Sequence, residues 1–538
     1  MSNSKLSRAL LHGEATRREF LRRASAFSLL GGAAPLAMNL ATLGSAVADG
    51  VADYKALVCV FLYGGNDAYN MVLATDSGSW SAYTTTRNQL PDPISLLRSG
   101  AKSTATDATV PQRLGGVLDL NAAASQPGRS FALHPAMPKM QALFNNAPSG
   151  GGRPRLGIVA NVGPLIRPTT KADYANAGFV KPAKLFSHND QQSTWQSFAP
   201  EGSTAGWGGR LADTCLVGNG AYNLFTAVSA TGNAVWLSGR QALQYQIAPS
   251  GLISVGLASL FGSTAHPDAN GAILSSDKSV YATMTRLMRQ PAGADVLGRD
   301  YAAVGARALD AELALRAKLP DQNLAPWGTP RPVPETNAPD PLLQYTSPLT
   351  GVQATNSLAQ QFQAVARMIQ AGKAMGLSRQ VFMVSLGGFD THDNQNRAQA
   401  ELLAKLDHGL DYFLTVLGDA GASEVTTFTA SDFGRTFTSN GDGTDHGWGS
   451  HHLVMGGAVK GGDIYGTFPQ YSVADASGNF SSPDQLRNGV MLPSTSVDQY
   501  AYTLAQWFGV GDGDLLGSSG ILPNLGNFNS SARNLGFV

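Results

Sequence analysis

The pattern that most constrains the fold lies between residues 381 and 430. Residues 381–386 (VFMVSL) form a continuous apolar run that ends in Gly387-Gly388, and residues 425–430 form a second run rich in threonine. Between them, apolar side chains recur at the spacing of one helix face: Leu402, Leu403, Leu406, Leu410, Phe413 and Leu417. A strand, a long helix and another strand form a βαβ unit, which requires a parallel sheet.

Further segments extend this pattern. Residues 56–63 (ALVCVFLY) and 156–162 are continuous apolar runs, typical of strands buried on both faces of a parallel sheet. Residues 357–375 are helical in pattern, and Ser496 stands three residues before Gln499, the spacing of a capping box that opens a helix toward Trp507. We therefore expect an α/β fold, and 49–538 as one large domain.

A different composition marks residues 201–345, which are rich in Gly, Ser, Ala and Pro and show weaker periodicity. Within them, residues 325–341 hold six prolines and indicate a surface loop. We interpret the region as a Gly/Ser-rich insertion or cap on the α/β domain.

Residues 1–48 resemble a twin-arginine signal peptide. Residues 16–22 (TRREFLR) contain Arg17-Arg18, a weakly apolar stretch follows, and residues 46–48 (AVA) have small-x-small cleavage spacing. The twin-arginine export machinery is thus an expected partner, and the mature protein is expected to be exported folded and to be periplasmic or secreted. No later stretch reaches the roughly 18 apolar residues of a membrane span, which predicts no span in the mature chain.

Charge argues against one class of partner. The chain has 38 Lys and Arg residues and 38 Asp and Glu residues, so its formal net charge is zero. A nucleic-acid-binding protein usually carries a basic surplus, and we therefore expect no nucleic-acid partner.

Acidic and histidine residues follow the predicted strands. Asp67 follows the first strand, Asp390 and His392 follow the strand at 381–386, and Asp432 follows the strand at 425–430. In open parallel sheets functional groups gather at these carboxyl ends. Carboxylate and imidazole together suit a divalent transition metal, with Zn favoured over Mn and Ca. The alternatives are a helix N-cap for each Asp and a packed or surface position for each His.

Later histidines are further candidate ligands. Asp445 and His446 lie on a Gly-rich loop that can turn inward. His451 and His452 begin an apolar run, in which adjacent side chains face opposite ways, so at most one of them faces a metal.

A second constellation, residues 186–195 (FSHNDQQSTW), suggests a nucleophile. Ser187, three residues before Asp190, resembles a helix start, where a hydroxyl beside a cation suits attack on an anionic ester. His188 or Arg435 would bind the ester oxygens. The alternatives are an N-cap for Ser187, a structural role for His188, and a structural ion pair for Arg435.

Six segments together resemble a family of twin-arginine-exported bacterial proteins of unknown function, placed near sulfatases in the alkaline phosphatase superfamily. They are FLYGGNDAYN (61–70), SHNDQQSTW (187–195), GWGGRLAD (206–213), GGFDTH (387–392), SDFGRT (431–436) and DHGWGSHHLVMGGAVKGGDIYGTFP (445–469). The resemblance implies an alkaline-phosphatase-like three-layer α/β/α sandwich with a mostly parallel central sheet.

The same resemblance implies metal ligands at Asp67, Asp390, His392, Asp432 and His446. The superfamily usually has Asp-His after the late strand, but Phe433 follows Asp432 here. Asp445-His446 is an alternative match to that pair, and the sulfatase Cys/Ser-x-Pro-x-Arg motif is absent.

Two functions are consistent with these features. The first is an exported metal-dependent hydrolase of phosphate or sulfate esters, acting on a small anionic ester or a sulfated or phosphorylated glycan. The alternative is a non-catalytic periplasmic or surface protein, for binding or assembly, that retains the fold.

Overall fold

A computed structural model describes residues 53–107, 110–122, 125–149, 151–249, 286, 296–330, 339–517 and 519–538. The predicted signal peptide, residues 1–48, lies outside the described residues, as does most of 250–295. Residues 53–538 form one compact unit.

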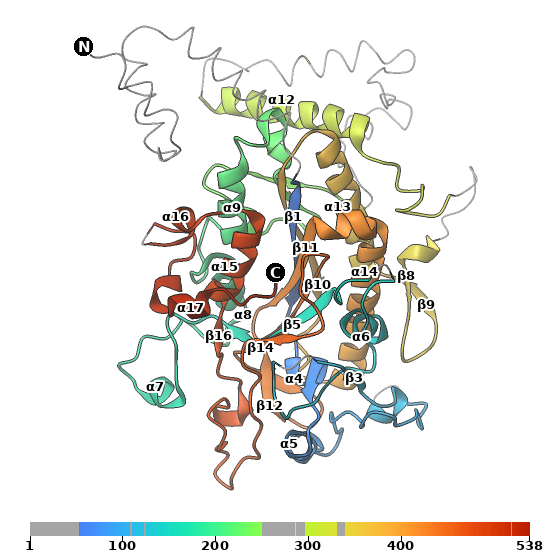
Figure 1. Ribbon diagram of the computed structural model, residues 1–538, viewed down its shortest axis with the longest axis vertical. Helices are drawn as coiled ribbons and strands as arrows, with labels where there is room; N and C mark the ends of the chain where they lie inside the picture. Colours follow the sequence, from blue (N-terminus) through green and yellow to red (C-terminus); the bar gives the residue numbers. More distant parts are fainter. Residues whose placement is uncertain are drawn as a thin grey trace. The chain divides into compact units, whose positions relative to one another are not determined.

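A nine-stranded sheet runs through the centre of this unit (Figure 1). Its order is β15-β5-β14-β11-β1-β10-β6-β7, and β16 pairs with β5 beside this path. The strands are β1 (Lys55–Tyr63), β5 (Leu156–Gly163), β6 (Ala227–Ser229), β7 (Gln244–Gln246), β10 (Arg379–Gly387), β11 (Val425–Ser431), β14 (Ser450–Met455), β15 (Ile464–Tyr465) and β16 (Thr495–Ser496). β14 is antiparallel to both neighbours, and the other pairs are parallel. The expectation of a largely parallel sheet in an α/β fold is confirmed.

The βαβ unit forms as predicted, with one refinement. β10, α14 (Gln395–Ser423) and β11 follow one another along the chain, but β1 lies between the two strands and pairs with both. Leu62 of β1 is level with Leu386 on one side and Ser431 on the other. The carboxyl ends of three strands therefore meet at one edge of the sheet.

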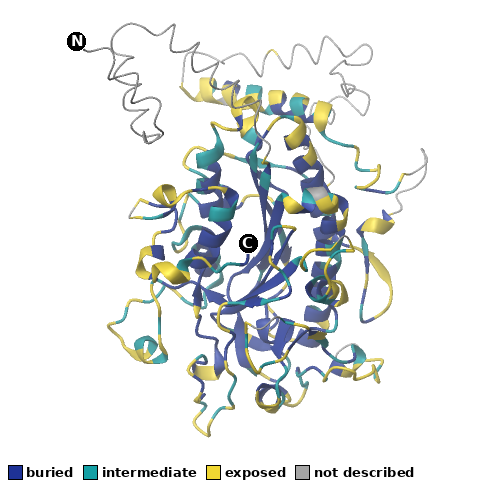
Figure 2. Cartoon of the chain, in the orientation of Figure 1, coloured by how far each residue is buried: buried dark blue, intermediate teal, exposed yellow. Residues whose placement is uncertain are grey.

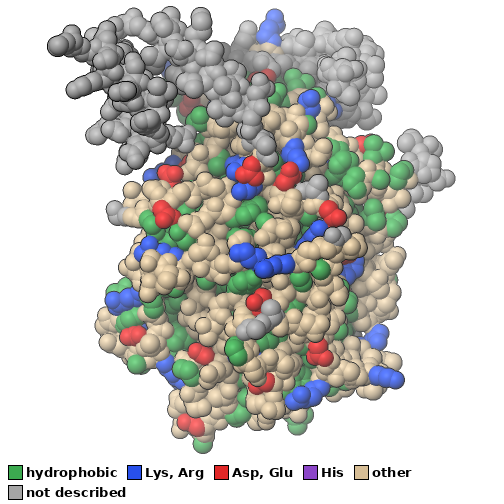
Figure 3. All heavy atoms as spheres, in the orientation of Figure 1, with side chains coloured by type: hydrophobic (Ala, Val, Ile, Leu, Met, Phe, Trp, Pro, Cys, Tyr) green, Lys and Arg blue, Asp and Glu red, His purple; other side chains and the backbone are tan. Residues whose placement is uncertain are grey.

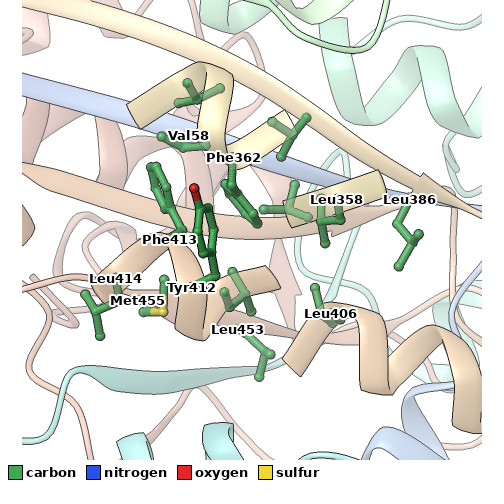
Figure 4. Close-up of a cluster of buried hydrophobic side chains, with 14 of the residues drawn as sticks. Val58, Leu358, Phe362, Leu386, Leu406, Tyr412, Phe413, Leu414, Leu453 and Met455 are labelled. Carbon is green, nitrogen blue, oxygen red and sulfur yellow. The ribbon is translucent and has the colours of Figure 1, made fainter. Parts of the chain in front are cut away.

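Helices pack on both faces of the sheet because β1 is apolar on both. Val58 and Val60 belong to a cluster with side chains of α13 (Ser357–Ala374) and α14, while Cys59 and Phe61 pack with α9 (Trp207–Cys215) and α15 (Val497–Phe508). Figure 4 shows the first cluster, and Figure 2 shows that the strands are buried while exposed residues gather on peripheral helices and loops. The opposed side chains of β1 thus pack against helices on both faces of the sheet.

The remaining elements are short or peripheral. The other α-helices are α4 (Ala68–Met71), α5 (Ser77–Arg87), α6 (Pro138–Asn145), α7 (Lys171–Ala175), α8 (His188–Ser197), α12 (Val296–Lys318), α16 (Asp512–Leu515) and α17 (Ser530–Arg533). Small antiparallel pairings join β2 (Val72–Ala74), β4 (Phe131–Leu133) and β3 (Leu118–Leu120), join β8 (Gln344–Thr346) to β9 (Gln353–Thr355), and join β12 (Arg435–Ser439) to β13 (Thr444–His446).

The predicted insertion, residues 201–345, needs a correction. Its first part supplies β6 and β7, which pair in parallel and extend the central sheet beyond β10. These strands are only three residues long and β7 is largely polar, so no apolar run marks them as strands in the sequence. β6 and β7 are therefore part of the central sheet.

Among the described helices, none combines the length and apolar character that crossing a membrane requires. On the face shown in Figure 3, positive and negative side chains are interspersed.

Candidate metal centre

The carboxyl ends of β1, β10 and β11 fit closely together. Gly64 follows β1 with φ of +115°, and a Cβ there would stand 2.4 Å from the backbone nitrogen of Asp390. A Cβ on Gly65 would stand 2.4 Å from the ring of Phe433. Only glycine accommodates both the left-handed backbone and these close approaches. The turn after β1 thus lets the loops after β10 and β11 close over it.

Asp390 lies at the centre of a histidine cluster in this region. Its Oδ1 is 3.1 Å from Nε2 of His392 and 3.2 Å from Nε2 of His446, and its Oδ2 is 3.4 Å from Nε2 of His188. The Nε2 atoms of His392 and His446 are 3.0 Å apart. Four potential ligand side chains from three separate segments therefore converge.

Two of the imidazoles are oriented through their other nitrogen. Nδ1 of His188 is 2.7 Å from Oδ2 of Asp432, and Nδ1 of His446 is 2.8 Å from the carbonyl oxygen of Phe186. Because these oxygens only accept, we assign a proton to each Nδ1. In the neutral form of each ring, the lone pair of Nε2 is then directed at Asp390, which is the arrangement of metal-binding histidines.

The third imidazole has a longer contact at its other nitrogen. Nδ1 of His392 is 3.4 Å from Oδ1 of Asp445, a side chain that is more than half exposed. Asp445 and Asp432, both predicted as ligands, are thus placed behind the rings of His392 and His188.

The electrostatics favour the metal-binding protonation states of Asp390 and His446, which are the ionised carboxylate and the neutral imidazole. Burial acts to raise the pKa of Asp390, but the hydrogen bond and charge of Arg435 outweigh it and hold the pKa below its usual value. Burial lowers the pKa of His446. The hydrogen bond to Asp432 raises the pKa of His188, so a cation at its Nε2 would compete with a proton.

These residues fit a divalent cation. The ligand atoms of His188, Asp390 and His446 all lie within 4.8 Å of one another. The buried Nε2 of His188 has no hydrogen-bond partner. The distances of 3.1 to 3.4 Å between Asp390 and the three Nε2 atoms are also those of N–H···O hydrogen bonds, so a cation here would take the place of protons, and imidazole with carboxylate is a donor set that suits Zn.

Local structure explains how the histidines reach this position. His188 is the first residue of α8, and His446 ends β13, where it pairs across the ladder with Arg435 of β12. The buried ring of Phe433 packs against His188 and His446, with ring centroids 4.8 and 4.6 Å apart. Phe433 thus supports both imidazoles.

Asp67 does not join this cluster. Its carboxylate forms a fully buried ion pair with Arg87, with Oδ2 at 2.5 Å and Oδ1 at 3.0 Å from the guanidinium nitrogens. Gln395 donates to Oδ2 at 2.6 Å, and the backbone N–H of Tyr69 donates to Oδ1, so that Asp67 caps α4. Both oxygens are occupied, and we leave Asp67 out of the candidate ligand set.

The other predicted catalytic groups are also engaged. The hydroxyl of Ser187 donates to Oδ2 of Asp190 at 2.9 Å, and Ser187 is the N-cap residue of α8. Arg435 is fully buried, and its Nη1 donates to Asp390 at 2.6 Å and to the carbonyl of Gly64 at 3.2 Å. Arg435 therefore contacts a candidate ligand and has no exposed donor for an ester oxygen.

His451 and His452 lie outside the cluster, on opposite faces of β14 as expected. His451 stacks on Phe468, and His452 packs edge-on against Trp195. Burial lowers the pKa of each to about 3. They are neutral core residues.

Sequence patterns did not single out several residues that support the cluster. Gln192 donates to Oδ2 of Asp432 at 2.8 Å, one turn of α8 beyond His188. Gln395 and Thr444 connect Asp67 with Arg435. Because polar residues are common at helix starts, Gln395 does not stand out in the sequence. The i, i+4 spacing of His188 and Gln192 was the only sequence signal that could have pointed to a supporting residue.

The fold and this cluster define an α/β protein with a candidate His and Asp metal centre at the carboxyl ends of parallel strands. A protein-family model with the description "Protein of unknown function (DUF1501)" matches residues 343–517. That segment contains Asp390, His392, Asp432 and His446, whereas His188 precedes it. No match was found among curated proteins.

Proposed function

We propose that this chain is an exported, divalent-metal-dependent hydrolase of phosphate or sulfate esters, built on an alkaline-phosphatase-like three-layer sandwich. The observation that carries the proposal is the convergence of His188, His392 and His446 on Asp390. The donor set favours Zn. The ester class comes from the resemblance of the sequence segments, and the substrate would be a small anionic ester or a sulfated or phosphorylated glycan.

When bound, the cation would supply Lewis-acid polarisation of an ester oxygen and activation of water as the nucleophile. The chain's own residues orient the site: Asp432 holds the His188 ring and Arg435 holds Asp390. The Asp390 and His392 side chains are 43% and 44% exposed, which leaves the cluster accessible to a substrate. Water is the favoured nucleophile, since the Ser187 hydroxyl is bonded to Asp190.

The direct test combines elemental analysis of the purified chain with a screen of aryl phosphates and aryl sulfates. We expect stoichiometric Zn and turnover that a chelator abolishes. Asp390→Ala should lose both metal and turnover because a charged ligand is removed. Asp393→Ala is the matched control, an exposed carboxylate in the same loop. Full metal content in Asp390→Ala would contradict the proposal.

One observation favours the alternative, a non-catalytic binding or assembly protein that keeps the fold. Neither Ser187 nor Arg435 offers a free donor at the cluster, because the first bonds to Asp190 and the second to Asp390, Gly64 and Thr444. A metal-loaded protein that hydrolyses none of the esters would support this alternative.

Export is a separate part of the proposal. Replacing Arg17 and Arg18 together by lysine should leave the uncleaved precursor in the cytoplasm, because the twin-arginine machinery reads the arginine pair. Fractionation of cells expressing both forms measures this. Normal processing of the double variant would rule out the twin-arginine route.

A further inference from the structure

A buried ion pair lies behind the candidate metal centre. Arg87 and Asp67 are both fully buried. Arg87 also donates to the carbonyl oxygens of Thr436 at 2.8 Å and Phe437 at 3.1 Å, and to Oδ1 of Asn70 at 2.8 Å. Burying two charges costs desolvation energy that their attraction often fails to recover, so such a pair is weak as a stabilising device. Its many partners instead make it a rigid anchor.

Gln395, the first residue of α14, links this anchor to the β12–β13 hairpin. Its Nε2 donates to Oδ2 of Asp67 at 2.6 Å, and its Oε1 accepts from the hydroxyls of Thr444 at 2.7 Å and Thr391 at 3.2 Å. A carboxylate only accepts, so the amide orientation is determined, with Nε2 toward Asp67. Gln395 is fully buried and both ends of its amide are satisfied.

Thr444 in turn forms hydrogen bonds with Arg435. Its hydroxyl uses its one hydrogen toward Gln395, so its oxygen is available to accept from Nε of Arg435 at 3.2 Å. The carbonyl of Thr444 accepts from Nη2 of the same guanidinium. Arg435 is thereby held along one edge, and its Nη1 donates to Oδ1 of Asp390 at 2.6 Å.

We infer that Gln395 and Thr444 are positioning residues of the metal centre, which set Asp390 through Arg435 from the buried Arg87–Asp67 pair. The inference rests on the proposed metal site. Gln395 sets the direction of the hydrogen bonds in this series, because its amide donates to the carboxylate of Asp67 and accepts from the hydroxyl of Thr444. Without its amide, Thr444 and Arg435 lose the partner that orients them, and Asp390 loses its alignment toward the three imidazoles.

The experiment measures Zn affinity of the full chain by competition with a chelator, and the visible spectrum of the Co²⁺ form. Gln395→Ala should weaken Zn binding by up to roughly 10-fold, the lower end of the cost of losing a group bonded directly to a metal ligand, because Gln395 acts through Thr444 and Arg435, and it should shift the Co²⁺ bands. Gln399→Ala is the matched control. Gln399 is also buried, one turn further along α14, and donates to the backbone oxygen of Asp67 at 2.8 Å. This hydrogen bond is not part of the series that runs from Asp67 through Gln395, Thr444 and Arg435 to Asp390.

A second pair of variants applies if Gln395→Ala does not fold. Thr444→Val removes the hydroxyl at nearly constant shape and should weaken Zn binding, whereas Thr444→Ser keeps the hydroxyl and should restore it. Equal affinity in wild type, Thr444→Val and Gln395→Ala, or equal loss in Gln395→Ala and Gln399→Ala, would overturn the inference while leaving the metal site intact. A wild-type protein that binds no Zn or Co²⁺ would overturn the proposed function itself, and the inference with it.

Discussion

At the scale of single residues, the same side-chain type takes different roles according to its neighbours. Asp390 and Asp67 both follow strands of one parallel sheet, yet Asp390 faces three imidazoles while Asp67 is enclosed by Arg87 and Gln395. Sequence position predicted both as ligands because strand ends gather at one edge. The partner of each carboxylate comes from a distant segment, which a local pattern does not specify.

Ser187 gives the first prediction. Its hydroxyl donates to Asp190, which keeps its ion pair with Lys184 and the backbone N–H of Glu201 when the hydroxyl is removed. Ser187→Ala should therefore cost about 1 kcal/mol of stability and leave metal content and ester turnover unchanged. Thermal melting and the aryl ester assay measure both. A folded variant without turnover would restore Ser187 as the nucleophile.

Gly64 gives the second prediction. A Cβ at this position would collide with the backbone of Asp390 and Phe389, and the backbone is left-handed. Gly64→Ala should lower the free energy of unfolding by roughly 2–5 kcal/mol and weaken metal binding, because the loop after β10 must move. Gly100, with φ of +81° and no atom within 4 Å of its Cβ, is the control for backbone strain alone. Similar metal affinity in both alanine variants would contradict this account of the turn.

At the scale of elements, the sequence predicted a helix best where local residues mark its first and last turns. The Ser496 capping box is present with Gln499, and α15 begins at the next residue as predicted. The apolar pattern of α14 ends at Leu417, and Gly418 has a non-helical φ of 63° before the helix resumes to Ser423. β6 and β7 carry no such signal, and their pairing in the sheet decides their conformation.

The start of α15 gives a prediction on pH. Burial raises the pKa of Asp498 to about 7, although Asn524 donates to both of its oxygens. The folded chain thus keeps a proton that the unfolded chain loses near pH 4. The stability that the protonated Asp498 carboxyl contributes is fully present below about pH 4. It is lost as the pH rises from there toward 7, by at most about 1.4 kcal/mol per pH unit.

Asp498→Asn removes this dependence because the amide does not ionise. The melting temperature of the variant relative to wild type should therefore rise between pH 5 and pH 8. Parallel pH profiles for the two proteins would show that Asp498 does not titrate in this range.

At the scale of the whole molecule, the candidate centre joins segments that are far apart in the sequence. His188 comes from α8, Asp390 from the loop after β10, and His446 from β13. A cation held by all three residues binds only the folded state, so its binding free energy adds to the free energy of unfolding of the entire unit.

The last prediction follows from that coupling. Zn at about 100 times its dissociation constant should stabilise the folded chain by about 2.7 kcal/mol, and a chelator should reverse the effect. His446→Ala should abolish the Zn-dependent shift in melting temperature. Calorimetric scans with Zn and with chelator measure it, and His408→Ala provides a histidine variant on α14 outside the cluster. An undiminished shift in His446→Ala would exclude His446 as a ligand.

The sequence by itself determined the parallel strands β1, β5, β10 and β11 and the helices α13, α14 and α15, because apolar periodicity and caps are local properties of the chain. It also placed Asp390 and Asp432 among the candidates at the strand ends, and His446 among those on a Gly-rich loop. Only the tertiary structure decided that Asp432 orients His188, that Asp67 pairs with Arg87, and that Gln395 and Thr444 connect that pair to Arg435. These contacts join residues that lie apart in the chain, and their choice depends on which side chains meet when the sheet and its loops pack together.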